Sequence, residues 1–162
     1  MNIVLLEPEI PQNAGNISRT CAVTHTASHM IRPFGFSVED KYLKRAGLDY
    51  WDMLDLHYYD NFQEFCEKNP GAKMWFATTK AQQVYSDVTY GADDFIVFGK
   101  ESAGIPEEIL MAHKEGCIRI PMFEESRSLN LSNSVAIILY EALRQQSFPD
   151  LKRFGQLHHH HW

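Results

Sequence analysis

Short apolar runs alternate with helical patterns along the whole chain. The runs are rich in β-branched and aromatic residues and predict strands at 2–6, 29–32, 56–59, 73–78, 94–98 and 116–120. Apolar spacing and helix-end signals predict helices at 11–25, 38–45, 61–68, 106–112 and 133–146. Because strands alternate with helices and are mostly apolar throughout, we expect an α/β domain with a mainly parallel sheet sandwiched by helices.

The first predicted helix carries two unlike stripes. The apolar stripe, which we expect to face the sheet, consists of Ala14, Ile17 and Cys21. The other stripe consists of Asn16, Arg19 and Val23. It places an amide beside a guanidinium, and such a pair can reach a phosphate or a reacting hydroxyl. For this segment alone, a solvated helix face is the simpler interpretation.

The last predicted helix also has two distinct faces. Its core face consists of Val135, Ile138, Leu139, Ala142 and Leu143. The nearly opposite stripe consists of Asn133, Ile137, Tyr140 and Arg144. Because an isoleucine and a tyrosine on this second face are expected to be buried as well, the pattern indicates a partner subunit.

Composition narrows the class of protein. A chain of 162 residues with ordinary apolar and charged fractions predicts one domain, which we place at 1–155. The His-rich segment 156–162 resembles a purification tag and is left out of the fold and of any metal site. Three scattered cysteines favour neither disulfides nor zinc and suit a reducing cytoplasm. No window approaches the roughly 20 apolar residues of a membrane span, and we expect no signal peptide.

The formal net charge of −6 argues mildly against a nucleic-acid partner. Phosphate binding draws on clustered Lys and Arg side chains. Net charge is nevertheless weak evidence, because a basic patch can lie on an acidic protein. One local group of basic residues is a candidate for such a patch: Arg32, Lys41, Lys44 and Arg45.

Turns rich in Gly, Asn or Ser follow three of the predicted strands, where α/β sheets bind small ligands. The richest lies in the stretch from Cys117 to Tyr140, although a polar loop before a helix N-cap is an equally open interpretation. The turn after the first strand lacks the G-x-G-x-x-G of dinucleotide folds, and the segment 99–104 lacks the Lys-Ser/Thr of a P-loop. Neither G-x-S-x-G nor H-E-x-x-H occurs, which excludes those hydrolase and zinc-protease classes.

These three turns resemble the three motifs of the SPOUT RNA 2′-O-methyltransferases. The motifs are N-x-G-N-x-x-R-T at 13–20, F-G-x-E-x-x-G-I-P at 98–106 and I-R-I-P-M…S-L-N-L-S-N at 118–133. The run K-R-A-G-L-D-Y at 44–50 is similar to the branch of this family that methylates the wobble nucleotide of tRNA. The resemblance covers almost the whole chain, and the motifs occur in the family's order.

The resemblance implies a C-terminal deep trefoil knot, a homodimer, and S-adenosyl-L-methionine bound in the knot loops, with S-adenosylhomocysteine as the product. It implies no metal and no membrane. The residues that match the family's cofactor site are Ala77, Thr78, Gly99, Glu101, Ile118, Ile120, Met122, Ser128, Leu129 and Asn130. Glycines let the backbone approach a ligand, and apolar side chains can sandwich an adenine ring.

For the chemistry, the resemblance assigns Arg19 to the target ribose, with Asn13 or Asn16 nearby and Tyr140 supporting the dimer or the RNA site. Because a guanidinium keeps its proton, we expect Arg19 to position the hydroxyl more than to deprotonate it. The implied partner is a tRNA anticodon stem-loop. The basic candidates for contacting it are Lys41, Lys44, Arg45, Lys80, Arg127 and Arg144.

Three other functions stay open at this point. The first is 2′-O-methylation of ribosomal RNA or of another tRNA position, because the motifs specify the reaction better than the substrate. The second is a non-catalytic RNA-binding module of the same fold, which the intact Asn, Arg, Glu and Ser set argues against. The third is a nucleotide-dependent oxidoreductase, which the missing glycine fingerprint argues against.

Overall fold

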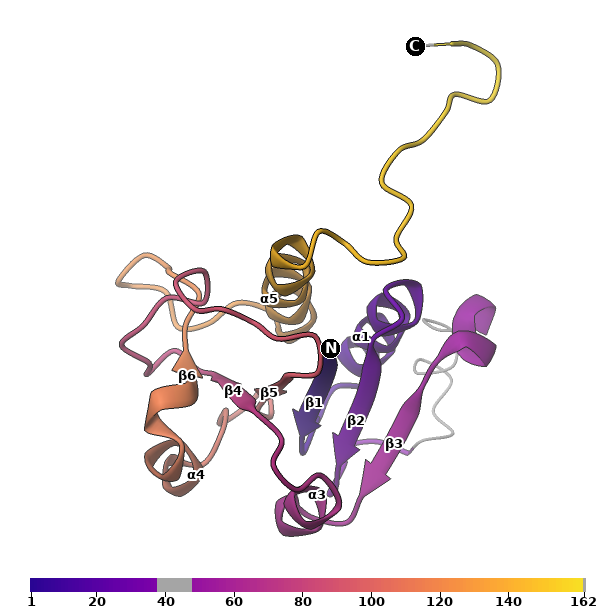
Figure 1. Cartoon of the computed structure of the whole chain (residues 1–162). Helices are drawn as coiled ribbons and strands as arrows, with labels where there is room; N and C mark the ends of the chain where they lie inside the picture. Colours follow the sequence, from indigo (N-terminus) through magenta and orange to yellow (C-terminus); the bar gives the residue numbers. More distant parts are fainter. Residues whose placement is uncertain (38–47, 162) are drawn as a thin grey trace.

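The computed structural model describes residues 1–37 and 48–161, and its centre is a six-stranded sheet (Figure 1). Neighbouring strands pair in parallel in the order β3-β2-β1-β5-β4-β6. The strands are β1 (Asn2–Leu6), β2 (Ala27–Ile31), β3 (Leu56–Tyr59), β4 (Met74–Ala77), β5 (Phe95–Phe98) and β6 (Cys117–Ile118). The expected mainly parallel sheet is confirmed. The helix expected at 38–45 and the basic candidates Lys41, Lys44 and Arg45 lie outside the described residues.

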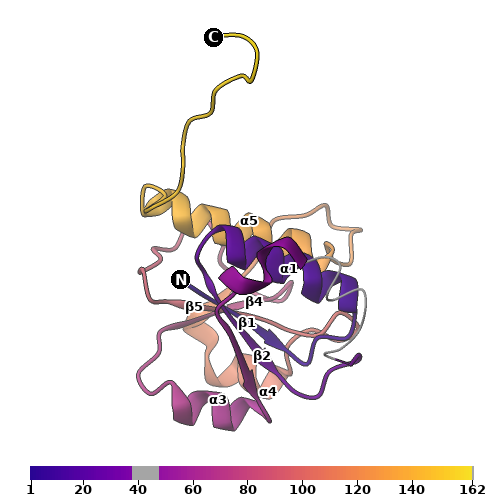
Figure 2. The same ribbon diagram turned by 90° about the vertical axis from the view of Figure 1, so that its right-hand side faces the viewer.

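Helices cover both faces of this sheet (Figure 2). One face carries α1 (Pro11–Val23) and α5 (Leu131–Gln145), and the other carries α3 (Phe62–Lys68) and α4 (Glu107–Ala112). Two short 3-10 helices are η1 (Leu48–Met53), which lies beside α1, and η2 (Lys114–Gly116). This arrangement confirms the predicted sandwich of a sheet between helices.

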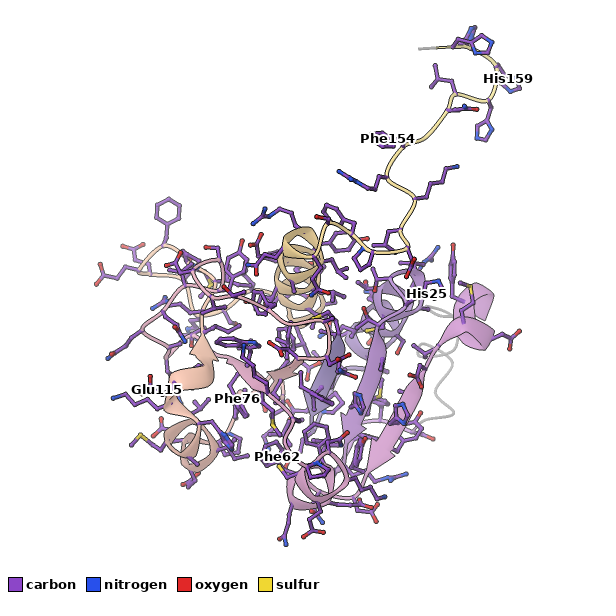
Figure 3. The ribbon with its side chains drawn as sticks, in the orientation of Figure 1. His25, Phe62, Phe76, Glu115, Phe154 and His159 are labelled. Atoms are coloured by element: carbon purple, nitrogen blue, oxygen red, sulfur yellow. The ribbon has the colours of Figure 1, made fainter. Side chains whose placement is uncertain are left out.

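Alternation along the strands builds one apolar core on each face. In β1, Ile3 and Leu5 pack toward α1 and α5, whereas Val4 and Leu6 pack toward α3 and α4. The apolar stripes predicted for the first and last helices are buried in the first core: Ala14, Ile17, Cys21, Val135, Ile138, Leu139, Ala142 and Leu143. In the second core, aromatic rings from α3 and β4 contact each other at 6.4 Å between centroids (Phe62 and Phe76, Figure 3).

The last helix begins at Leu131, two residues before the predicted start. Asn130 explains the early start because its side-chain Oδ1 accepts hydrogen bonds from the backbone N–H groups of Ser132 (2.9 Å) and Asn133 (3.3 Å). These N–H groups have no partner within the helix, and asparagine is among the preferred caps. The cap places the Ser/Asn-rich motif at the junction of loop and helix.

The strand expected at 116–120 is reduced to a short β6. The chain then turns toward the β4–β5 connection, where Arg119 N donates to Gln83 O (3.0 Å) and Tyr85 N donates to Arg119 O (2.9 Å). Pro121 has no N–H group to extend the ladder. The residues after β6 therefore form a loop and do not extend the strand.

After α5, Phe148 and Leu151 pack against the first core. Beyond them the chain runs away from the domain, carrying Phe154 and His159 (Figures 1 and 3). The domain limit of 1–155 remains a prediction.

Candidate active site

A cavity of about 630 Å³ lies at the carboxyl ends of β4, β5 and β6. Its walls come from residues within 77–80, 98–105, 118–122 and 127–131, and the start of α1 adds Ile10 and Asn13. The volume falls within the roughly 300–1,000 Å³ typical of small-molecule sites. The position is the one where open parallel sheets bind ligands.

Every residue expected to bind the cofactor lines this cavity: Ala77, Thr78, Gly99, Glu101, Ile118, Ile120, Met122, Ser128, Leu129 and Asn130. The structure thus brings the second and third motifs together around one space. Sequence reasoning missed other wall residues, among them Ile10, Thr79, Lys100, Ser102, Gly104, Ser134 and Ile138. Helical spacing was an available signal for two of them, since Ser134 and Ile138 follow Asn130 at steps of four residues.

The Glu101 carboxylate ties the second motif to the first. Its Oε2 accepts from Glu9 N at 2.8 Å, and its Oε1 accepts from Ile10 N at 3.2 Å and from Asn13 Nδ2 at 3.0 Å. These donors lie at the start of α1, where a carboxylate is also favoured by the helix dipole. Glu101 therefore shapes the cavity wall and directs much of its hydrogen-bonding capacity to the protein itself.

Asn13 extends this connection to the third motif. The side chain is 5% exposed, and its Oδ1 accepts from Asn130 Nδ2 at 3.0 Å. Asn130 in turn caps α5. Asn13 is thereby engaged at both ends of its amide and bridges the three motifs. Its contacts give no direct support to the implied catalytic role.

A second set of contacts, which the sequence did not predict, joins residues 7–9 to residues 100–102. The Glu9 carboxylate accepts from Ser102 N (2.8 Å) and Ser102 Oγ (2.9 Å), and these two hydrogen bonds lower the pKa of Glu9. Lys100 Nζ lies 2.8 Å from Glu7 Oε2, and the hydrogen bond to that carboxylate raises the pKa of Lys100. Consecutive residues of the second motif thus bind back to the segment before α1.

Gly99 lets the end of β5 lie directly against the turn at Gly104. A Cβ at position 99 would lie 2.1 Å from the Gly104 carbonyl carbon and 2.3 Å from Ile105 N. Gly104 itself has a φ of +71°, which favours glycine. The close approach of these two segments therefore requires the glycines of the second motif.

The remaining catalytic candidates do not line the cavity. Asn16 and Arg19 are exposed on α1, and Tyr140 is 46% exposed on α5. Because Arg19 follows Asn13 by six residues, it lies about 9 Å farther along the helix axis. Its Cζ lies 4.9 Å from the ring centroid of Tyr50, in η1. In one chain the guanidinium therefore lies outside the walls of the cavity.

The basic candidates differ in their surroundings. Lys80 lines the cavity but pairs with Glu107 at 2.7 Å, and Arg144 on α5 pairs with Glu141 at 2.8 Å. The Lys80–Glu107 pair is exposed and therefore weak, so a phosphate can compete for Lys80. Arg144 is held by two hydrogen bonds to Glu141, whose side chain is only 14% exposed, and is less available. Arg127 also lines the cavity, and within the described residues no carboxylate lies at ion-pair distance from it.

Residues 1–37 and 48–161 contain no group of three or more His, Cys, Asp or Glu side chains placed to hold a metal ion. Over the same residues, none of the helices is both long enough and apolar enough to cross a membrane.

Comparison with known proteins points to one family. Over 153 residues the chain is 59% identical to a Listeria innocua protein that is provisionally named tRNA (cytidine(34)-2′-O)-methyltransferase. The match covers 93% of this chain and 90% of the relative. It is 45% identical to the tRNA (cytidine(34)-2′-O)-methyltransferase of Yersinia pestis, covering 92% and 96% of the two chains.

A solved structure, described in terms of the 2-OH methylation of C/U34 on tRNA, superposes with a TM-score of 0.86 at 42% identity. The match covers 90% of this chain and 95% of the solved one. Residues 1–140, which include the three motifs and the cavity, match the model of the SpoU rRNA methylase family. The chain therefore belongs to the SpoU rRNA methylase family.

Proposed function

We propose that the protein transfers a methyl group from S-adenosylmethionine to the ribose 2′-hydroxyl of the wobble nucleotide, a cytidine or a modified uridine, in tRNA anticodons. The observation that carries this proposal is the single cavity in which the second and third motifs meet at the strand ends, next to the start of α1. The names of the relatives support the choice of tRNA and of nucleotide 34. The family description mentions rRNA, so ribosomal RNA is the second candidate substrate.

The cavity residues suit this cofactor. Ile120, Met122 and Leu129 offer apolar surface for an adenine ring, and the loops after β4 and β6 offer backbone donors and acceptors for its edge. Because Gly99 and Gly104 have no side chains, the end of β5 and the turn at Gly104 can pack closely together in the cavity wall. When bound, S-adenosylmethionine supplies an activated methyl group on a sulfonium sulfur.

A homodimer would complete the site. The outer face of the α1–α5 layer exposes Val23 (39%), Ile137 (37%) and Tyr140 (46%), and Arg19 lies on the same layer. We infer that a second copy covers this face through a two-fold interface, in which the same patch of each subunit is used. That contact would bring the partner subunit's Arg19 to a cavity that this chain's own Arg19 does not reach.

Within such a dimer, Arg19 and a substrate phosphate hold the 2′-hydroxyl in line with the methyl group. The hydroxyl oxygen forms a bond to the methyl carbon as the carbon–sulfur bond breaks, and the hydroxyl proton leaves to a neighbouring acceptor or solvent. The products are the 2′-O-methyl ribose and S-adenosylhomocysteine. Positioning of this kind can contribute several kcal/mol to catalysis without a strong base.

The implied trefoil knot remains a prediction, and contacts of the β4–β5 connection support it. This connection bonds to the chain after β6 through Gln83 and Tyr85, and Val88 O accepts from Gln145 Nε2 of α5 at 3.0 Å. A loop that lies against both segments is what a C-terminus threaded through it requires. A cytoplasmic location fits a tRNA substrate and likewise remains a prediction.

The decisive experiment is methylation of unmodified tRNA with labelled cofactor, followed by mass mapping of the nucleosides. We expect label at the first anticodon position, and none in a matched tRNA with a 2′-deoxy ribose there. Ribosomal RNA is tested in parallel. Label in ribosomal RNA alone, or at another tRNA position, would show that the substrate is wrong. Absence of transfer to any RNA, with the cofactor bound, would favour the non-catalytic RNA-binding module.

A further inference from the structure

Tyr50 is the last residue of the run K-R-A-G-L-D-Y at 44–50, and its ring lies under the Arg19 guanidinium. The Arg19 Cζ is 4.9 Å from the centroid of this ring, inside the roughly 6 Å limit for a cation–π contact. Tyr50 is half-buried in η1, and η1 packs beside α1. The ring is therefore held by the fold, whereas the long arginine side chain is exposed.

The type of contact matters for the chemistry. A cation–π contact uses the face of the guanidinium and leaves its five N–H donors at the edge available. A carboxylate partner would occupy those same donors and compete with an RNA phosphate. Within the described residues, no carboxylate pairs with Arg19, and no acceptor is hydrogen-bonded to its guanidinium. The ring thus restrains the cation while leaving it able to bind an anion.

We propose that Tyr50 is a positioning residue for methyl transfer, which holds the Arg19 guanidinium on the outer face of α1 in the orientation that meets the substrate ribose and phosphate. This inference rests on the proposed function, because it needs Arg19 to act on the RNA. Tyr50 itself contacts neither cofactor nor reacting atoms; it acts by limiting the rotamers of an arginine side chain that otherwise samples many.

The test compares three variants in steady-state methylation of tRNA. Tyr50→Leu removes the ring, Tyr50→Phe keeps the ring without the hydroxyl, and Tyr58→Leu is the matched control. Tyr58 is also a half-buried tyrosine beside an arginine, with Arg32 Cζ 5.6 Å from its ring centroid. Loss of that pair controls for the general effect of deleting a tyrosine from the fold.

We expect Tyr50→Leu to lower kcat about 3- to 30-fold, the range that a cation–π contact spans. KM for S-adenosylmethionine should stay within about two-fold, because the ring is outside the cavity. Tyr50→Phe should restore kcat to within about two-fold of wild type, and Tyr58→Leu should leave kcat unchanged. In an Arg19→Lys background, Tyr50→Leu should cost less than it does in the wild type, because coupled residues are not additive.

Three results would overturn the proposal: an unchanged kcat in Tyr50→Leu, an equal loss in Tyr50→Leu and Tyr50→Phe, or a loss that appears in KM alone. Each is separable from failure of the proposed function. This inference alone would be overturned if the wild-type enzyme methylates tRNA and Arg19→Ala is inactive, but Tyr50→Leu is unaffected. Wild-type enzyme that methylates no tRNA would overturn the function first.

Discussion

The cavity and the outer face of the α1–α5 layer are built in opposite ways. Around the cavity, polar side chains are bonded to one another: Glu101 to the start of α1, Asn13 to both Glu101 and Asn130, and Glu9 to Ser102. On the outer face, Arg19 and Tyr140 are exposed. One region is complete within a single chain, and the other presents groups to a surface that this chain leaves open.

This difference separates two tasks that the sequence motifs combine. Binding a small cofactor requires preformed walls, and the network of hydrogen bonds within one chain supplies them. Acting on a ribose requires groups that meet an RNA from outside, and in the proposed reaction that group is the exposed guanidinium of Arg19 on α1. We therefore expect variants on the outer face to affect catalysis with little effect on cofactor binding, and variants in the network to affect both.

The largest effect is expected for Arg19→Ala. Removing the guanidinium should lower methyl transfer about 1,000-fold or more, because a preorganised charged donor at the reacting centre is lost. Affinity for S-adenosylhomocysteine, measured by calorimetry, should stay within a few-fold, because Arg19 does not line the cavity. Transfer near the wild-type rate would show that the arginine assignment is wrong. A large loss of cofactor affinity would show that the two regions are not separate.

The second prediction concerns the open face itself. Ile137→Glu should raise the dimer dissociation constant about 100-fold or more, because a two-fold interface brings two copies of the new charge into an apolar contact. Sedimentation measures this change, and activity should fall with the fraction of dimer. Met111→Glu is the control, since Met111 is 75% exposed on α4, on the opposite face of the sheet. A variant that stays dimeric and active would place the interface elsewhere.

The third prediction addresses the network. Glu101→Ala leaves Glu9 N, Ile10 N and Asn13 Nδ2 without their acceptor, and should lower the free energy of unfolding by roughly 2–3 kcal/mol. Cofactor affinity should fall about 10-fold, because the wall between the first two motifs loosens and polar positioning in a binding site is lost. The control is Glu108→Ala, an exposed acid on α4. Unchanged affinity would mean that the network is not what holds the cavity in shape.

Most of the fold was predictable from the sequence because the signals are local. Continuous apolar runs predicted the strands, and period-3.6 patterns predicted the buried stripes of α1 and α5. The motifs predicted the residues expected to bind the cofactor, and these residues line one cavity. The start of the last helix differed from the predicted one because a side chain bonds to the backbone there. Asn130 caps the first N–H groups of α5, so the helix begins at Leu131. The sequence of residues 84–92 shows neither a helix nor a strand pattern, and this segment contacts Arg119 after β6 and Gln145 of α5 as well as Lys73 before β4.

The roles of individual polar residues were harder to predict, because they depend on pairings between distant positions. Asn13 and Asn130 are 117 positions apart, and Glu9 and Ser102 are 93 apart. No spacing rule connects such pairs, so the bridging role of Asn13 was not predictable from local patterns. The Arg19–Tyr50 contact was hidden for the same reason: the sequence places the two residues in different motifs, and only the packing of η1 beside α1 joins them.

The smallest effect is expected at His29, which lies in the sheet that both regions share. The ring is 4% exposed, its Nδ1 is 2.9 Å from Tyr59 Oη, and burial, aided by the neighbouring His57, lowers its pKa to about 4. Because the unfolded chain binds this proton near pH 6.5, stability is complete above that pH and falls as the pH drops toward 4. Between pH 7.5 and 5 the loss from this group should be about 2 kcal/mol.

Urea unfolding of wild type and His29→Gln at both pH values isolates this contribution, because glutamine does not titrate. The wild type should lose about 2 kcal/mol more than the variant between the two pH values. An equal slope in both proteins would assign the acid sensitivity to other groups. Since His29 is in β2, away from the cavity wall and from the open face, protonation should weaken cofactor binding and methyl transfer together, in proportion to the unfolded fraction. A pH effect on methyl transfer alone, in folded protein, would instead point to a titrating group at the reacting centre.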